Sequence, residues 1–220
     1  MAATPTNLFG ETLSAGLNDL TQTLKNAATV VAKDPNRLAT MVGRLSDIEG
    51  KNLNLRGILF ELFVAYLVRD EGHWLEVGSL AKDPKSRKTA EIDVLVDISR
   101  RECMAVECKA KVPGGELSVE EVEKWIGRLS IWQSWMKEHQ TRREASHSFQ
   151  IWTTGTISPE ALSLLQREKQ KRTKILIDWK DGDDVREYAA LKKEGRVRDA
   201  FDQHFFKHPL AEDFTPEQDD

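Results

Sequence analysis

The chain has 220 residues, of which 40% are hydrophobic and 31% charged, and its net charge at pH 7 is −4. This composition is typical of a globular protein with one domain, or one domain plus an appendage. A negative total charge argues against a protein that binds nucleic acid through its overall charge. No apolar run reaches about 18 residues, so we expect no membrane-spanning helix and no membrane partner.

The first residues, Met1 to Thr6, lack a basic segment followed by an apolar stretch, so no secretory signal is expected. The two cysteines, Cys103 and Cys108, fall on one predicted strand and face opposite sides of it. We therefore expect two reduced core residues in a cytoplasmic protein, and neither a disulfide nor a zinc site.

Residues 1–50 are expected to form an N-terminal helical hairpin. Leucines recur at alternating four- and three-residue steps between residues 8 and 32, which places them on one face of a helix. Asp34-Pro35 ends this helix, and a second apolar pattern follows from Leu38 to Ile48. The hairpin could pack against the rest of the chain, form a dimer or dock a partner protein.

A buried helix is predicted at residues 57–68, because this stretch is apolar on every side except for Glu61. A buried carboxylate is costly unless it is paired or binds a metal. Glu61 is therefore either a metal-site residue or the partner of a buried cation such as Lys109.

A short strand is expected at residues 74–78, and two acidic strands follow, at residues 91–97 and 104–110. Side chains alternate along a strand, so Glu107 and Lys109 share one face of the second strand. Such a face can hold a hard divalent cation and present an amine to a phosphate. A solvated strand face is the ordinary alternative.

The pairing of these strands decides whether the acids meet. If Asp93 lies opposite Glu107, their numbers sum to 200, the turn is centred on Arg100, and the odd-numbered residues of both strands share one face. That face carries Asp93, Asp97, Glu107 and Lys109. A slip of one residue would separate the carboxylates, so a metal site requires a connection of odd length.

The rest of the chain alternates helices and strands. Ser118 and Glu121 have the spacing of a capping box and open a helix whose tryptophans we interpret as core residues. Further strands are expected at 149–154 and 174–179, a helix begins at Pro159, and a last helix runs from about 184 to 195. The order predicts an α/β fold with a mixed sheet, because the first three strands can form a meander and the helix-linked strands need crossovers on both faces.

With these residues in this order, the chain resembles the restriction-endonuclease-like PD-(D/E)xK nuclease superfamily, in particular its Mrr-like branch. The family's acidic and basic site positions are matched by Glu61, Asp93, Glu107 and Lys109. The resemblance covers roughly residues 55–190 and implies a restriction-endonuclease-like mixed sheet flanked by helices. Ile92 stands where the name has proline, and Mrr-like members often have glutamine at the position of Glu107.

The resemblance implies metal-assisted hydrolysis of a phosphodiester bond. Asp93, Glu107 and the backbone carbonyl of Cys108 would hold Mg²⁺ or Mn²⁺, which lowers the pKa of a bound water and neutralises charge on the phosphate. Lys109 would orient or activate that water, or stabilise the developing negative charge. Glu61 would hold a second ion or a water of the first.

Basic residues are clustered, and local patches can bind a phosphate backbone without a basic total. We predict nucleic-acid contacts at Lys82, Lys85, Arg87, Lys88, Lys111 and Gln133. Ordinary surface charge is the alternative for the basic cluster at 82–88, and a surface amide is the alternative for Gln133.

The predicted organisation is an N-terminal helical hairpin at 1–50, a nuclease-like core at 51–195 and a C-terminal segment at 196–220. The tail after Ala211 has five acids and no base, so its removal from a net charge of −4 leaves +1 for residues 1–211. We expect this tail to be disordered. It is either a plain solvated segment or a competitor of DNA for the basic clusters at 82–88 and 167–174.

The leading hypothesis is a Mg²⁺-dependent deoxyribonuclease, an endonuclease of the kind used in restriction or phage defence. The alternative is a catalytically quiet nuclease-fold module that binds nucleic acid or a partner protein. A complete set of site residues favours the first, and the near-neutral charge and the N-terminal hairpin favour the second. DNA is the expected partner, RNA remains open, and the chain is expected to act as a homodimer or as a subunit of a larger nuclease complex.

Overall fold

The computed structural model describes residues 53–70, 72, 74–139 and 142–192, together with residues 195, 199, 202, 204 and 205. The helical hairpin predicted at 1–50 and the acidic tail lie outside the described residues. Within the described part of the chain, no helix is both long and apolar enough to cross a membrane.

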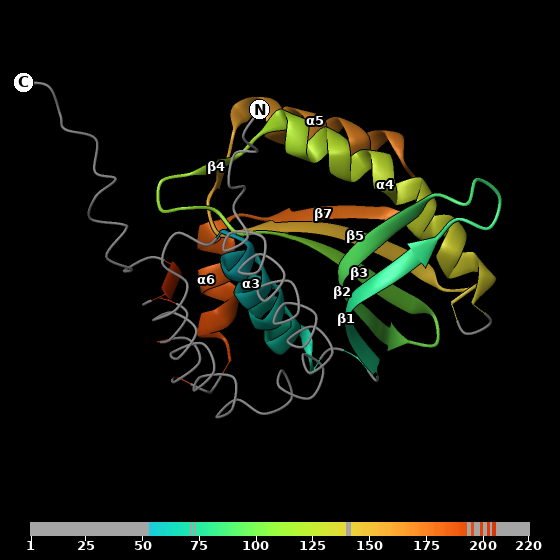
Figure 1. Ribbon diagram of the computed structural model, residues 1–220, viewed down its shortest axis with the longest axis horizontal. Coiled ribbons are helices and arrows are strands. Elements are labelled where there is room, and N and C mark those ends of the chain that lie inside the picture. Colours follow the sequence, from blue (N-terminus) through green and yellow to red (C-terminus); the bar gives the residue numbers. More distant parts are fainter. Residues whose placement is uncertain are drawn as a thin grey trace, which may run out of the picture.

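The described chain has an α/β fold with a mixed sheet, as predicted (Figure 1). The five-stranded sheet has the order β1-β2-β3-β5-β7, and its first three strands form the predicted antiparallel meander. β5 and β7 run parallel to β3, since each of these two strands is reached through a helical crossover. The strands are β1 (Trp74–Lys82), β2 (Thr89–Ser99), β3 (Glu102–Lys109), β5 (Ser146–Thr153) and β7 (Leu176–Lys180).

Helices cover both faces of the sheet (Figure 1). α3 (Leu53–Val68) and α6 (Gly182–Ala190) lie on one face and enclose what we call the first core. α4 (Val119–Glu138) and α5 (Pro159–Lys171) lie on the other face and enclose the second core. The last helix is thus shorter than the predicted 184–195, and it begins two residues earlier because Asp181 caps it.

α3 is the most deeply buried element of the described chain. Every residue from Ile58 to Val68 is buried, which confirms the prediction of a buried helix at 57–68. A helix that is apolar around its whole circumference can be stable only where protein surrounds it. The position of α3 within the core fixes where Glu61 enters the interior.

The register of β2 against β3 is the predicted one. The pairs run from Val94 with Val106 to Asp97 with Cys103, and the numbers in each pair sum to 200. Val106 and Met104 therefore face the first core, and Cys103 and Ala105 face the second. The two cysteines are free and lie on opposite faces, as predicted.

The connection between β2 and β3 differs in detail from the turn expected around Arg100. Ser99 pairs with Glu102, which leaves a two-residue turn at Arg100 and Arg101 and a register shift between Asp97 and Ser99. The extra residue, Ile98, is taken up as a β-bulge. Because the bulge adds one residue to β2, the pairs can sum to 200, as the predicted register requires, although the turn itself has only two residues.

The β1–β2 hairpin bends at the level of Asp93. Val94 packs in the first core, whereas Ile92, two residues earlier on the same strand, packs in the second. Residues two apart on a regular strand face the same side, so the strand rotates between them. In β1, Gly78 has a φ of 71° near this level, a conformation that favours glycine. Gly78 is therefore a bend inside β1 and not the predicted strand end, and β1 continues to Lys82.

A second, two-stranded sheet was not predicted. β4 (Glu116–Leu117) pairs in parallel with β6 (Thr156–Ile157), and these strands precede α4 and α5 directly. A Cβ atom at Gly155 would lie 2.1 Å from the carbonyl oxygen of Gly115, so only glycine allows these loops to cross. Strands of two residues are too short to show a hydrophobic period.

The predicted start of α4 is confirmed. The Ser118 side chain accepts a hydrogen bond from the Glu121 backbone, and the Glu121 side chain accepts one from Ser118, which completes a capping box. The helix buries Trp125 and Trp132 in the second core, as predicted for core residues.

Arg142 follows α4 along the chain and binds the β1–β2 hairpin at the end opposite its turn, where Trp74 pairs with Asp97. Its guanidinium donates to both carboxylate oxygens of Asp97, at 2.7 and 3.0 Å. The same group lies over the rings of Trp74 and Trp135, at 4.7 and 5.4 Å from their centroids. A planar cation suits this arrangement, because it can bind a carboxylate at its edge while its faces contact aromatic rings.

We expect Arg142→Met to destabilise the protein by about 2–3 kcal/mol, since it leaves the Asp97 charge without its cation. Chemical denaturation followed by tryptophan fluorescence measures this. The double variant Arg142→Met with Asp97→Asn should recover part of the loss, and Arg143→Met at the exposed neighbouring arginine serves as the matched control. Equal stability of Arg142→Met and Arg143→Met would contradict this role.

Candidate active site

Glu107 is the most deeply buried acid of the candidate site, with 1% of its surface exposed. One carboxylate oxygen, Oε1, accepts hydrogen bonds from Lys109 Nζ at 2.6 Å and from Arg128 Nη1 at 2.7 Å. The other oxygen, Oε2, is buried and has no hydrogen-bond partner among the described residues. A buried oxygen in this state is an electrostatically favourable position for a cation.

Asp93 lies just beyond the point where the pairing of β2 with β3 ends. The backbone ladder between the two strands ends at the pair of Val94 and Val106. One step further, the Cys108 amide donates to the Asp93 carboxylate at 2.7 Å, so a side chain replaces the missing backbone acceptor. Burial raises the pKa of Asp93 well above its usual value, and the negative charges of Glu107 and Glu61 raise it further.

Glu61 reaches the site from α3, on the other face of the sheet, and is 9% exposed. After burial, its negative charge adds to the raised pKa of Asp93 and of the Cys108 thiol, so Glu61 lies near both residues. Within the described residues, no three His, Cys, Asp or Glu side chains are already arranged as a metal-binding group.

Lys109 forms its ion pair with Glu107, two residues before it on the same strand face, as the alternation predicts. Burial alone would lower the pKa of Lys109, but the charge and hydrogen bond of Glu107 outweigh it and the pKa is raised. Lys109 is therefore an ammonium at neutral pH. Of the roles predicted for it, charge stabilisation and orientation fit this state, and proton abstraction does not.

Cys108 contributes only its backbone to the site. Burial, followed by the charges of Asp93 and Glu61, raises the pKa of its thiol well above the usual value, so the sulfur stays protonated. The side chain packs in the first core. A metal contact through the Cys108 carbonyl stays a prediction.

Arg128 is the site residue that sequence reasoning missed. It projects from α4 onto Glu107 and is 40% exposed along its side chain. A signal was available, because Arg128 directly precedes Leu129 of the buried stripe and lies seven residues, or two turns, after Glu121. Both residues therefore lie on the edge of α4 that meets the end of β3.

Two of the predicted nucleic-acid contacts, Lys111 and Gln133, are half-buried, and their contact with nucleic acid stays a prediction. Lys111 pairs with Glu121, and although burial raises the pKa of Glu121, hydrogen bonds from Lys111 and Ser118 bring it below the usual value. Gln133 is half-buried on α4, about 140° around the helix axis from Arg128. Arg128, and not Gln133, is the side chain of this helix that reaches the carboxylates.

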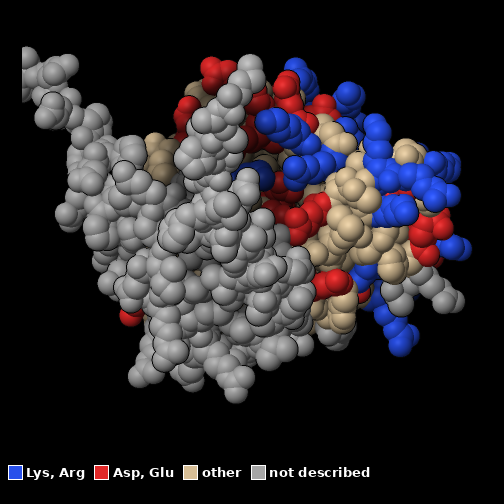
Figure 2. All heavy atoms as spheres, viewed as in Figure 1, with Lys and Arg blue, Asp and Glu red and all other residues tan. Residues whose placement is uncertain are grey.

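The other predicted contacts form one exposed group that we call the basic loop, Lys82, Lys85, Arg87 and Lys88. Figure 2 shows Lys and Arg gathered at the end of the molecule where Figure 1 places the turn between β1 and β2. Asp83 organises the loop, since its carboxylate accepts bonds from the backbones of Lys85 and Ser86, at 3.2 and 3.3 Å. The positive charges are thus presented on an ordered turn.

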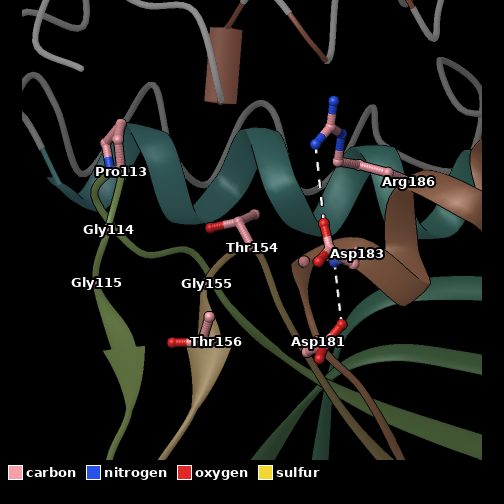
Figure 3. Close-up of a pocket in the computed structure, with 10 residues that line it drawn as sticks. Pro113, Gly114, Gly115, Thr154, Gly155, Thr156, Asp181, Asp183 and Arg186 are labelled. Atoms are coloured by element: carbon pink, nitrogen blue, oxygen red, sulfur yellow. Dashed lines mark hydrogen bonds and ion pairs between the residues drawn. The ribbon is translucent and has the colours of Figure 1, made fainter. Parts of the chain in front are cut away.

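A cavity of about 430 Å³ lies beyond the ends of β3, β5 and β7 (Figure 3). Loops around Gly115 and Gly155 form one side, and the start of α6 with Asp181 and Asp183 forms the other. Asp181 already accepts bonds from the first amides of α6, so these amides are not open to an anion. The lining contains none of the four predicted site residues.

Comparison with known proteins gives no family. No family model matches the chain, and no curated protein is similar to it. A solved structure described as the protein of unknown function AF1548 matches this chain with 16% sequence identity and a TM-score of 0.44. The match covers 62% of this chain and 68% of that one.

The raised pKa of Asp93 predicts how the stability of the metal-free protein depends on pH. The folded state keeps a proton that the unfolded chain loses above about pH 3.9, so this group costs stability as pH rises through its raised pKa. Asp93→Asn should therefore melt higher than the wild type at neutral pH, by roughly 2–4 °C for each kcal/mol relieved.

Thermal melts in EDTA between pH 4 and pH 8 check this expectation. The difference should shrink toward pH 4, because the folded carboxyl keeps its proton there and the unfolded one, with a pKa of about 3.9, is about half protonated. Asp178→Asn, at an aspartate with 43% of its side chain exposed, is the matched control and should show no such trend. A constant difference across the whole range would refute the electrostatic explanation.

Proposed function

We propose that the protein is a divalent-cation-dependent endonuclease of the PD-(D/E)xK type that hydrolyses DNA phosphodiester bonds. The observation that carries the proposal is the meeting of Asp93, Glu107 and Lys109 at the point where two strands of a mixed sheet part. The repulsion between Asp93 and Glu107 favours binding of a cation, and the Lys109 ammonium beside them can contact a phosphate, as a phosphate-cleaving site requires.

The donor set fits a hard divalent cation. Asp93 and Glu107 would hold Mg²⁺ or Mn²⁺ through carboxylate oxygens, the ligands such ions prefer, and Glu61 adds a third negative charge nearby. The buried Oε2 of Glu107 supports this fit, because a carboxylate oxygen in the interior needs a positive partner. A bound cation there supplies charge neutralisation of the phosphate and a lower pKa for water.

The residues of the chain have distinct tasks in this proposal. The Cys108 amide fixes the orientation of Asp93, so the carboxylate is held in place before any ligand arrives. Lys109, kept protonated by Glu107, donates hydrogen bonds to a phosphate oxygen and stabilises negative charge that develops on it. Burial of the acids excludes water that would weaken these interactions.

The basic loop is the proposed contact with the nucleic-acid backbone. Its four cations lie at the tip of the hairpin that also carries Asp93, so one hairpin links the backbone contact to the candidate site. A chain with a net charge of −4 needs such a local patch, or a partner subunit, to gain affinity for DNA. RNA is the alternative substrate, and the proposal includes action as a homodimer or as a subunit of a larger nuclease complex.

The second candidate function is a catalytically quiet module that binds nucleic acid or a partner protein. One observation favours it: Oε1 of Glu107 already has two cationic partners from the chain itself. A retired site could remain stable in this state without a metal ion.

A plasmid-cleavage assay with Mg²⁺, Mn²⁺ and EDTA decides between the two functions. We expect nicking or linearisation with either metal ion and none with EDTA. Lys109→Met should lower the rate at least about 100-fold while Mg²⁺ binding is retained, since the ammonium stabilises charge but is not a ligand. Lys137→Met, which removes an exposed lysine of α4, should cleave normally. No metal-dependent cleavage by the wild type would favour the quiet module.

Neutralising the basic loop tests its role in binding. The triple variant Lys85→Gln, Arg87→Gln and Lys88→Gln should bind duplex DNA more weakly, with a salt dependence that is shallower by about 0.9 for each phosphate that the loop no longer neutralises. Anisotropy titrations in EDTA between about 50 and 200 mM salt measure both quantities. The same charge change on α5, at Arg167, Lys169 and Lys171, is the control. If the affinity of both triple variants falls equally, the loop has no special role.

A further inference from the structure

Arg128 and Lys109 hold the same oxygen of Glu107 in different ways. Lys109 comes from the same strand, two residues away, and 28% of its side chain is exposed. Arg128 comes from a separate element, α4, and 40% of its side chain is exposed. Lys109 is thus confined by the strand it belongs to, whereas the guanidinium can leave Glu107 for solvent with little change in the fold.

Arg128 and a divalent cation would compete for one carboxylate. Glu107 has only 1% of its surface exposed, and its Oε1 already accepts hydrogen bonds from Lys109 and Arg128. A further cation at Oε2 would meet strong repulsion while Arg128 stays in place, because charges interact strongly where water is excluded. Departure of Arg128 removes this repulsion and leaves Lys109 with Glu107.

The departing guanidinium needs another anion. Arginine presents five donors in a planar fork that matches phosphate oxygens, and the partly exposed position of Arg128 beside the site makes it accessible to a bound backbone. A phosphate would therefore draw Arg128 away from Glu107 and leave the carboxylate to the cation.

We propose that Arg128 is an exchangeable counter-ion of Glu107, which occupies the carboxylate until a divalent cation binds and moves to the phosphate of a bound nucleic acid. The inference rests on the proposed function and adds a regulatory property to it. Because linkage is reciprocal, nucleic acid raises the metal affinity of the site and the metal ion raises its affinity for nucleic acid. The site is then filled mainly when substrate is present.

The test measures Mn²⁺ affinity from the electron paramagnetic resonance signal of the free ion, without any cleavage. Without nucleic acid, Arg128→Met should bind Mn²⁺ about 5- to 10-fold more tightly than the wild type, because the competing cation is gone. Lys137→Met removes a charge from the exposed face of the same helix and should match the wild type. Arg128→Lys retains a cation, and its affinity should lie between those of the wild type and Arg128→Met.

The same titration with a hydrolysis-resistant phosphorothioate duplex tests the transfer to phosphate. The duplex should tighten Mn²⁺ binding about fivefold in the wild type and by less than twofold in Arg128→Met. Unchanged or weaker Mn²⁺ binding by Arg128→Met, or equal tightening by the duplex in both proteins, would overturn the exchange. A wild type that binds no Mn²⁺ at all would instead refute the proposed function, and the exchange with it. If Arg128→Met does not fold, Arg128→Lys decides, since affinity equal to the wild type in both titrations would overturn the proposal.

Discussion

The hydrogen bond from the Cys108 amide to the Asp93 carboxylate is the contact on which the candidate site depends. β2 and β3 part at this point, and the parting leaves a buried amide that the backbone no longer satisfies. An unpaired buried amide is costly, so an acceptor is needed here. Asp93 supplies it, and in doing so it places its carboxyl in the interior beside Glu107 and Glu61, so that burial and then these two charges raise its pKa. The carboxylate that satisfies the buried Cys108 amide thereby also joins the two acids Glu107 and Glu61.

β2 carries two aspartates whose surroundings assign them different roles. Asp97 is paired through both oxygens with Arg142, which lies between two tryptophans, so its charge is neutralised within the fold. Asp93 has an amide donor and two neighbouring acids, and Lys109 compensates it only in part. The first arrangement stabilises the hairpin by itself, and the second gains most when a cation is added. This contrast separates a structural carboxylate from a candidate functional one on the same strand.

α4 connects the helical layer to the site at two levels. Glu121 binds Lys111 just beyond β3, and Arg128, two turns later, binds Glu107 within β3. The capping box at Ser118 fixes where the helix begins, and the small β4–β6 sheet fixes where Ser118 lies. These contacts at the start of α4, together with the packing of its tryptophans on the sheet, set the position of Arg128 over the carboxylate.

The sequence by itself determined the features that follow from local period and chemistry. The apolar residues around the whole circumference of the helix predicted that α3 is buried. The alternation of side chains along a strand predicted that Glu107 and Lys109 share a face. The requirement that acids meet predicted the register of β2 and β3, because a one-residue slip reverses every side chain. Residues 1–50 and the acidic tail lie outside the described residues, and their predictions stand as made.

Only the tertiary structure decided the features that depend on contacts between distant segments. The bend at Gly78 and Asp93 moves the even-numbered side chains of β2 from the core under α4 to the core under α3, and no single window of sequence contains both cores. The crossing of Gly115 and Gly155 joins loops 40 residues apart, and its strands are too short to show a period. Arg128 reads locally as an ordinary surface arginine of an amphipathic helix. It becomes part of the site because packing of the tryptophan face of α4 onto the sheet brings its guanidinium to Glu107.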